Sequence, residues 1–227
     1  MFRTVLAVLT FSVVAGATPV LFNTVGGVDA QGNPVSASGS VNVADGGLVT
    51  VTLNNLQTGI FAADQLLSDF FFTLSSAPGV PLNTTSTPTG SLVTVASGGV
   101  VTSSNATITG WALTSSGGTI HLDSLADGPS QTIIGSVSNA PNASITGNHN
   151  PYLNGSATFS FTIAGVTSGT TVSNGIFSFG TDAGDNITGC VVGGPSCHSS
   201  TVPEPVTSAL VGSGLIALFF VRRRVRG

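Results

Sequence analysis

Residues 155–164 read Gly-Ser-Ala-Thr-Phe-Ser-Phe-Thr-Ile-Ala (GSATFSFTIA), and from Ser156 onward apolar and hydroxyl side chains alternate. The odd positions 157–163 carry Ala, Phe, Phe and Ile, and the even positions 156–162 carry Ser and Thr. Because successive side chains of a β-strand point to opposite faces, this pattern predicts a strand with one buried and one solvent-facing side.

The same pattern recurs along the chain. Residues 35–43 (VSASGSVNV) alternate in the same way, and Gly- and Pro-containing turns separate further apolar runs. We therefore expect an all-β fold over residues 18–188, an antiparallel β-sandwich of the jelly-roll or Ig-like type. The expected core includes Trp111 and Phe70–Phe72, and a helix of about two turns is expected over Gly59–Leu67. The other predicted strands are Leu48–Leu53, Phe70–Leu74, Leu92–Ala96, Ala106–Leu113, Thr119–Leu125, Gln131–Val137 and Thr171–Phe179.

Charged residues are rare and unevenly placed. They make up 6% of the 227 residues, where about a quarter is usual. Residues 18–202 contain eight Asp but no Glu, Lys or Arg. This part of the chain can form no Lys or Arg salt bridge. It is also unsuited to nucleic acid, because phosphate binding relies on Lys and Arg to replace counterions.

The N-terminus has the three parts of a secretory signal. Arg3 is followed by the apolar run Val5–Val14 and then by Ala15-Gly16-Ala17. Small residues at Ala15 and Ala17 suit signal peptidase, so residues 1–17 are predicted to be a signal peptide cleaved after Ala17. A buried N-terminal helix is the alternative.

The C-terminus has the pattern of a membrane anchor. Val206–Val221 is an apolar run that as a helix would be about 24 Å long. The chain's other basic residues follow it, and such a cluster stays on the cytoplasmic side of a membrane. The sequence thus predicts a transmembrane helix over 206–221 with a cytoplasmic tail that holds Arg222, Arg223, Arg224 and Arg226.

The junction before this run carries a distinctive motif. Val202-Pro203-Glu204-Pro205, the apolar helix and the arginine cluster together resemble the PEP-CTERM sorting signal, over residues 202–227. The resemblance implies recognition and cleavage by an exosortase, a membrane protease-like enzyme of exopolysaccharide-producing bacteria. It further implies an inner-membrane-anchored precursor that is later released to the cell surface or extracellular matrix. An ordinary anchor with a proline-rich stalk is the alternative.

Residues 189–201 are expected to form a stalk between the β-domain and this signal. Cys190 and Cys197, the chain's two cysteines, lie close together in it, and an exported segment favours a local disulfide. A zinc site formed by Cys190, Cys197 and His198 is the alternative.

Candidate catalytic residues are few. The sequence has no Gly-x-Ser-x-Gly motif, and His121 with Asp123 on one strand face could at most orient an imidazole. Glycosidase chemistry needs two nearby carboxylates, for which Asp64 with Asp69 or Asp123 with Asp127 would have to serve. We expect an exposed polar face at these positions and no enzymatic activity.

No metal site is expected, and calcium is the candidate to test against that expectation. Asp182, Asp185 and Asn186 lie in a Gly-containing segment, and calcium prefers oxygen ligands. The spacing is not that of an EF-hand, and Asp, Asn and Gly also form plain turns. No other cofactor is expected.

Together these patterns predict a non-enzymatic exported protein of the cell surface or extracellular matrix, with exopolysaccharide as a candidate partner. The alternative is a module that binds carbohydrate, with or without calcium, or ice. Trp111 and Tyr152 are the aromatic candidates for carbohydrate, and the Thr158, Ser160 and Thr162 face is the candidate for ice.

Replacing Ala15 and Ala17 with leucine should block signal-peptide cleavage, because the signal-peptidase pocket takes small residues at these positions. The expected product is an uncleaved precursor in the membrane fraction, measured by intact mass. A mature protein that still begins at Thr18 would contradict the assignment.

Overall fold

The computed structural model describes residues 18–24, 26–76, 78–126, 131–181 and 185–194, and within them the fold is all-β, as the sequence predicts. Helical segments there are short: α1 (Ala143–Thr146) and three 3-10 turns, η1 (Asp45–Gly47), η2 (Ala63–Gln65) and η3 (Ser97–Gly99).

The helix expected over 59–67 is wrong. Its place is taken by the single turn η2, and strand β6 (Leu67–Leu74) begins one residue after it. The Gln65 side-chain oxygen accepts a hydrogen bond from the backbone N–H of Phe61 at 3.0 Å, which closes the turn locally. Leu66 and Leu67 are then buried in different clusters, so tertiary packing overrides the apolar periodicity.

The first sheet contains the stretch quoted at the outset. Its strand order is β14-β5-β4-β1-β17, and every neighbouring pair is antiparallel. The bounds are β14 Ser156–Thr162, β5 Leu48–Asn55, β4 Ala37–Val43, β1 Val20–Asn23 and β17 Cys190–Val191.

The second sheet follows the order β7-β10-β11-β6-β12-β13-β8-β9, and β15, itself paired with β16, is attached to the other edge of β6. Among the described ladders, β12 with β13 is parallel, so the expectation of a purely antiparallel fold is corrected there. The bounds are β7 Asn83–Ser86, β10 Trp111–Ser116, β11 Thr119–Asp123, β12 Ile133–Ile134, β13 Tyr152–Asn154, β8 Leu92–Val95, β9 Val101–Ser104, β15 Val172–Phe179 and β16 Asp185–Thr188; the short β2 (Gly27–Val28) and β3 (Pro34–Val35) pair with each other.

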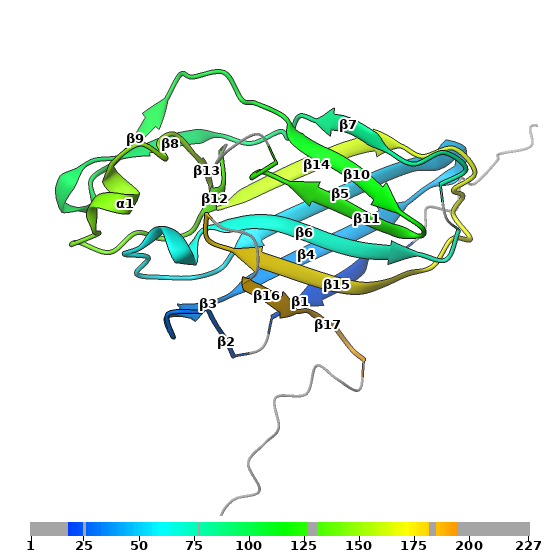
Figure 1. Cartoon of the computed structure of the whole chain (residues 1–227), viewed down its shortest axis with the longest axis horizontal. Helices are drawn as coiled ribbons and strands as arrows, with labels where there is room; N and C mark the ends of the chain where they lie inside the picture. The colour runs from blue at the N-terminus through cyan, green and yellow to red at the C-terminus, as the bar shows by residue number, and fades with distance from the viewer. Residues whose placement is uncertain (1–17, 25, 77, 127–130, 182–184, 195–227) are drawn as a thin grey trace, which may run out of the picture. The chain divides into compact units, whose positions relative to one another are not determined.

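The two sheets form layers in a β-sandwich-like arrangement. Figure 1 shows β4, β5 and β14 lying behind β6, β10, β11 and β15. One core cluster joins them, with Phe159 from the first layer and Phe70, Trp111 and Phe177 from the second, all fully buried. The Trp111 and Phe159 rings lie 4.9 Å apart between their centroids. The predicted core role of Trp111 and of Phe70 and Phe72 is confirmed.

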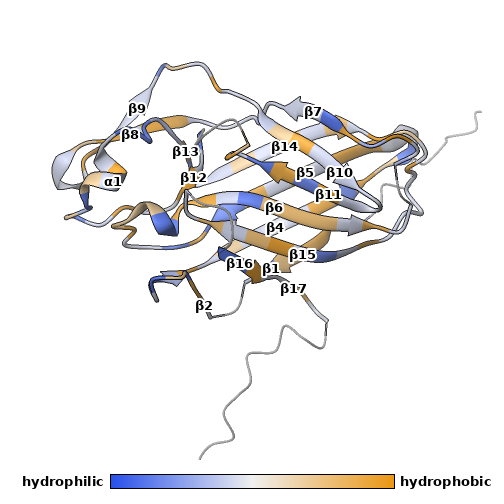
Figure 2. Ribbon diagram, viewed as in Figure 1, coloured by the Kyte–Doolittle hydropathy of each residue, from blue (hydrophilic) through white to orange (hydrophobic). Residues whose placement is uncertain are grey.

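A second core cluster lies beneath the β8–β9 end of the second sheet. It joins Ile60, Ile134 and Ile145 around the buried Tyr152 ring. The Tyr152 hydroxyl donates a hydrogen bond to the Ile145 carbonyl at 2.8 Å, so its polar atom is satisfied inside an apolar cluster. Figure 2 shows hydrophobic residues along both layers and hydrophilic positions among them on β6 and β11.

The β-domain continues past residue 188. Strand β17 pairs with β1, matching Val191 to Phe22, and the compact unit ends at Val192. Cys190, expected in a stalk, therefore lies in a strand, with its Sγ 3.4 Å from the Asn23 carbonyl oxygen. Its expected partner Cys197 and His198 lie outside the described residues, so the disulfide stays a prediction. In the described part of the chain, no helix has the length and apolar character needed to span a bilayer.

The β4–β5 turn offers a matched test of this packing. Gly46 and Gly47 both have positive φ, 80° and 81°. A Cβ at Gly46 would meet nothing within 4 Å, whereas one at Gly47 would lie 2.3 Å from the Ile163 carbonyl oxygen.

Gly46→Ala should therefore lower the free energy of unfolding by about 1–2 kcal/mol, the cost of a left-handed conformation. Gly47→Ala carries the same cost plus a backbone clash, and a further loss of about 1–3 kcal/mol is expected. Urea unfolding of both variants measures the difference. Equal losses would contradict the close approach of Ile163 to this turn.

Candidate functional site

The outer face of the second sheet holds a cluster of ionisable side chains. On β6, Phe70 and Phe72 point into the core, so Asp69 and Phe71, which alternate with them, point to the other face. On β11, Leu122 points into the core, and His121 and Asp123 point outward by the same rule.

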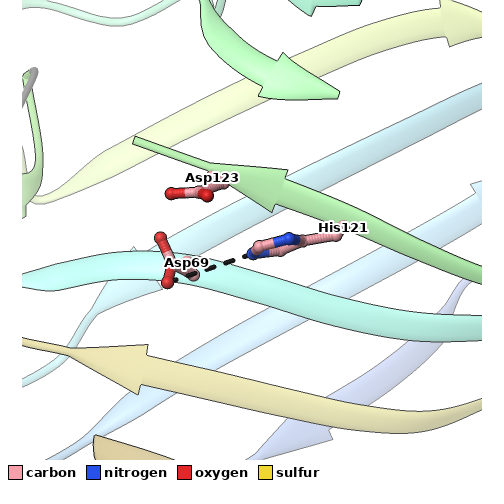
Figure 3. A group of neighbouring side chains, drawn as sticks. All are labelled: Asp69, His121 and Asp123. Atoms are coloured by element: carbon pink, nitrogen blue, oxygen red, sulfur yellow. Dashed lines mark ion pairs between the residues drawn. The ribbon is translucent and has the colours of Figure 1, made fainter. Parts of the chain in front are cut away.

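Strand register brings the members of this cluster together. Asp69 lies directly opposite Asp123, and Phe71 lies directly opposite His121. Figure 3 shows the three polar side chains converging from the two adjacent strands. One candidate ligand atom from each residue can be chosen so that all lie within 4.8 Å of one another. The His121 Nε2 and an Asp69 carboxylate oxygen are 4.0 Å apart.

Asp69 is the buried member of the cluster. It is 4% exposed, and one of its carboxylate oxygens has no hydrogen-bond partner. Burial raises the pKa of Asp69 to about 6, with a smaller contribution of the same sign from the Asp123 carboxylate beside it. His121 opposes this shift, because its proximity favours the ionised carboxylate. Asp69 is thus an acid held in a setting that disfavours its charge.

The other two members are held in defined orientations. The His121 ring stacks on Phe71, with centroids 3.8 Å apart and planes 10° apart. Its Nε2 is buried and has no hydrogen-bond partner, while 22% of the side chain remains exposed. One Asp123 oxygen accepts the Leu125 backbone N–H at 2.6 Å, so the carboxyl group is anchored through one of its two oxygens.

This arrangement allows two kinds of chemistry. Two neighbouring carboxyl groups can share a proton, because keeping one of them neutral avoids the repulsion between two negative charges. Two carboxylates and an imidazole are also ligands for a divalent metal ion. Among the described residues, these three are the His, Cys, Asp or Glu side chains that lie close enough together to hold a metal ion.

Two members of this cluster, His121 and Asp123, are predicted from the sequence to lie on one strand face. His121 and Asp123 share a strand face, as the alternation of β11 predicts. Of the carboxylate pairs considered for glycosidase chemistry, Asp64 with Asp69 is not brought together by strand pairing: Asp69 lies opposite Asp123, and Asp64 lines a hollow of about 170 Å³ together with Asp185. Asp127 lies outside the described residues. The alternation of side chains along β6 places Asp69 on the face opposite to Phe70. This local pattern does not show which strand pairs with β6, so it could not identify Asp123 as the neighbour of Asp69.

The calcium candidates do not form one cage. Asp185 and Asn186 are adjacent in strand β16, opposite Phe179 and Ser178 respectively, so their side chains point to opposite faces. The Asn186 side-chain oxygen accepts the Ser178 hydroxyl, and an Asp185 oxygen accepts the Ala30 backbone N–H at 3.2 Å. Asp182 lies outside the described residues.

The aromatic candidates for carbohydrate binding are not available at the surface. Trp111 and Tyr152 are both completely buried. The Trp111 indole N–H donates to the Gln131 carbonyl at 3.1 Å, so its polar edge is also engaged inside the protein. A hollow of about 510 Å³ lies near Gln57, Val101 and Ile134, and among the described residues no titratable side chain lines it.

The remaining sequence-predicted residues lie outside the described part of the chain. They are Ala15, Ala17, Val202, Pro203, Glu204, Pro205, Arg222, Arg223, Arg224 and Arg226. Comparison with known proteins gives no family assignment: no family model matches the chain, and neither a curated protein nor a solved structure matches it.

Asp69→Asn should stabilise the metal-free protein at neutral pH. The folded pKa of about 6 lies above the ordinary 3.8, so between these values the folded state binds more protons than the unfolded state. Stability is therefore lost as pH rises through about 6, by about 3 kcal/mol at pH 7.5. Asparagine keeps the shape without the charge, so its advantage should be about 1–3 kcal/mol at pH 7.5 and below about 1 kcal/mol at pH 4.

Urea unfolding with EDTA present at both pH values measures this advantage. Asp45→Asn is the control with the opposite sign, because hydrogen bonds from the Ser168 hydroxyl and backbone lower the pKa of Asp45. Its contribution to stability is present at neutral pH and lost as pH falls below 3.8. An Asp69→Asn protein that is less stable than the wild type at pH 7.5 would contradict the assigned cost of the charge.

Proposed function

We propose that this chain is a non-enzymatic exported protein, sorted by an exosortase-like membrane protease to the cell surface or extracellular matrix. The observation that carries the proposal is a sequence order: Val202-Pro203-Glu204-Pro205, the apolar run 206–221 and the arginine cluster follow a β-domain. In this proposal, signal peptidase removes residues 1–17 and the precursor is anchored in the inner membrane until its C-terminal signal is processed.

The described domain suits a structural or adhesive role in such a setting. On the outer face of the first sheet, hydroxyl and amide groups pair across strands: the Thr52 and Thr158 hydroxyl oxygens are 3.0 Å apart, and the Asn54 amide donates to the Ser38 hydroxyl at 3.0 Å. These neutral groups can hydrogen-bond a neutral polymer without ionic contacts. In this proposal the domain is a sandwich of the jelly-roll or Ig-like type that contacts exopolysaccharide.

A second candidate function is surface binding of carbohydrate or ice through that same face. The observation that favours it is register: Thr158 lies opposite Thr52, which lies opposite Ser40, and Ser160 lies opposite Thr50. Hydroxyl side chains are thus arrayed at the spacing of paired strands, about 4.8 Å apart across the sheet. With Trp111 and Tyr152 buried, stacking of sugar rings on these aromatics is not part of the candidate function.

The sorting proposal is tested by Pro203→Ala/Glu204→Ala/Pro205→Ala. Because the apolar run and the arginines remain, insertion should proceed and processing should stop. The variant should accumulate in the membrane with Arg222–Arg226 retained, while the wild type loses this tail. Intact mass of both proteins, from a host that has the sorting enzyme, is the measurement.

Neutralising the arginines is the matched control. It should disturb membrane orientation, because the positive charges hold the tail on the cytoplasmic side. A surface-located wild-type protein that still ends at Gly227 would overturn the sorting proposal and leave an ordinary anchor.

A further inference from the structure

We propose that Asp69, His121 and Asp123 bind one divalent transition-metal ion, of which Zn²⁺ is representative, on the outer face of the second sheet. The proposal does not depend on how the protein is sorted. It rests on the convergence of three ligand side chains, on two buried polar atoms without hydrogen-bond partners, and on the charge of the surrounding chain.

The geometry requires a small adjustment of side chains. Ligands about 2.0–2.2 Å from a shared zinc ion lie about 3–3.5 Å from one another. The ligand atoms here lie within 4.8 Å of one another, and the His121 Nε2 is 4.0 Å from Asp69. Rotations of the carboxyl groups that move their oxygen atoms by about 1 Å therefore bring the three ligand atoms within reach of one ion. The backbone already supplies the fixed part, because Asp69 and Asp123 are directly paired across β6 and β11.

Two buried polar atoms of the cluster have no hydrogen-bond partner. An Asp69 carboxylate oxygen and the His121 Nε2 are both buried and without hydrogen-bond partners. Buried polar groups are normally hydrogen-bonded, so both atoms keep an uncommitted lone pair in the same cluster of ligand types. Both are electron-pair donors when Asp69 is ionised and the imidazole is neutral, which is the form that metal ions bind.

The sequence contributes an independent argument. No Lys or Arg occurs between residues 4 and 221, so the β-domain has no cationic side chain of these types to place beside the two carboxylates. Buried carboxylates are usually paired with a cation or coordinate a metal. With Asp69 buried beside Asp123, a bound cation supplies the charge that this part of the chain lacks.

The donor set selects the class of ion. Calcium and magnesium take oxygen ligands, whereas an imidazole nitrogen with carboxylate oxygens suits zinc and other divalent first-row metals. Stacking on Phe71 fixes the plane of the His121 ring. The Leu125 backbone N–H holds one Asp123 oxygen and leaves the other for the ion. Both His121 and Asp123 are partly exposed at the edge of the cluster, so water can complete the coordination.

The test is equilibrium dialysis of the full-length protein against Zn²⁺ at pH 7.5, with bound metal counted by mass spectrometry. One Zn²⁺ per chain is expected. Asp69→Asn and His121→Gln should each weaken affinity by at least about tenfold, since even a hydrogen-bond partner of a ligand is worth about 10–100-fold. His149→Gln and His198→Gln are matched controls with histidines outside the cluster, and both should bind as the wild type does.

Thermal unfolding gives a second readout that does not depend on the binding assay. Zn²⁺ should raise the Tm of the wild type, because binding to the folded state alone stabilises it. At the same Zn²⁺ concentration it should raise the Tm of Asp69→Asn by less, because the weaker site is less occupied. A variant that folds normally in EDTA but gains less from Zn²⁺ has lost a ligand and not the fold.

Three results would overturn the proposal. They are failure of the wild type to bind Zn²⁺, an equal loss of binding in His149→Gln or His198→Gln, and displacement of Zn²⁺ by an equal concentration of Ca²⁺. In the first case Asp69 and Asp123 are a carboxyl pair that shares a proton. In the second the metal lies elsewhere on the chain, and in the third the ion is of the hard, oxygen-binding class.

Discussion

The packing of aromatic rings between the two sheets is the interaction on which the rest of the structure depends. No Lys or Arg is present between residues 4 and 221, so opposite-charge pairs of the usual kind cannot hold the layers together. Phe70 lies at the centre, with ring centroids 4.8 Å from Phe177, 5.7 Å from Phe72 and 6.1 Å from Phe22. These rings come from β1, β6 and β15, and burying each removes a large apolar area from water.

Neutral amides do the work that salt bridges do elsewhere. The buried Asn55 amide donates to the carbonyls of Gln65 and Ile133, both at 2.9 Å, and so joins a first-sheet strand to the turn before β6 and to β12. Gln131 likewise donates to the Thr107 carbonyl and accepts the Thr109 N–H. Such groups satisfy buried backbone atoms without a charge to desolvate. Asp69 differs from these amides, because it is a buried carboxyl group and one of its oxygens has no hydrogen-bond partner. The outer face of β6 is therefore a candidate for function.

The sequence predicted the parts of this structure that depend on local pattern. The alternation in residues 156–162 recurs as β14, with Phe159 buried and Ser160 exposed, and the shared face of His121 and Asp123 follows from the same period. The contact of Asp69 with Asp123 was not predictable, because β6 and β11 are separated by the β7–β10 segment and non-local pairing leaves no local signal. Tertiary packing also explains why the helix predicted over 59–67 does not form and why the Trp111 and Tyr152 rings are buried.

The cost of ionised Asp69 bears on why a carboxylate is present at all. A penalty of about 1–3 kcal/mol at neutral pH is a large fraction of a net stability of about 5–15 kcal/mol. Asparagine has nearly the same shape and would avoid the penalty, so packing does not account for aspartate at this position. What aspartate adds is negative charge, placed directly opposite a second carboxylate and beside an imidazole nitrogen that has no hydrogen-bond partner. A charge that lowers the stability of the metal-free protein raises its affinity for a cation, because the bound ion relieves the repulsion between the carboxylates.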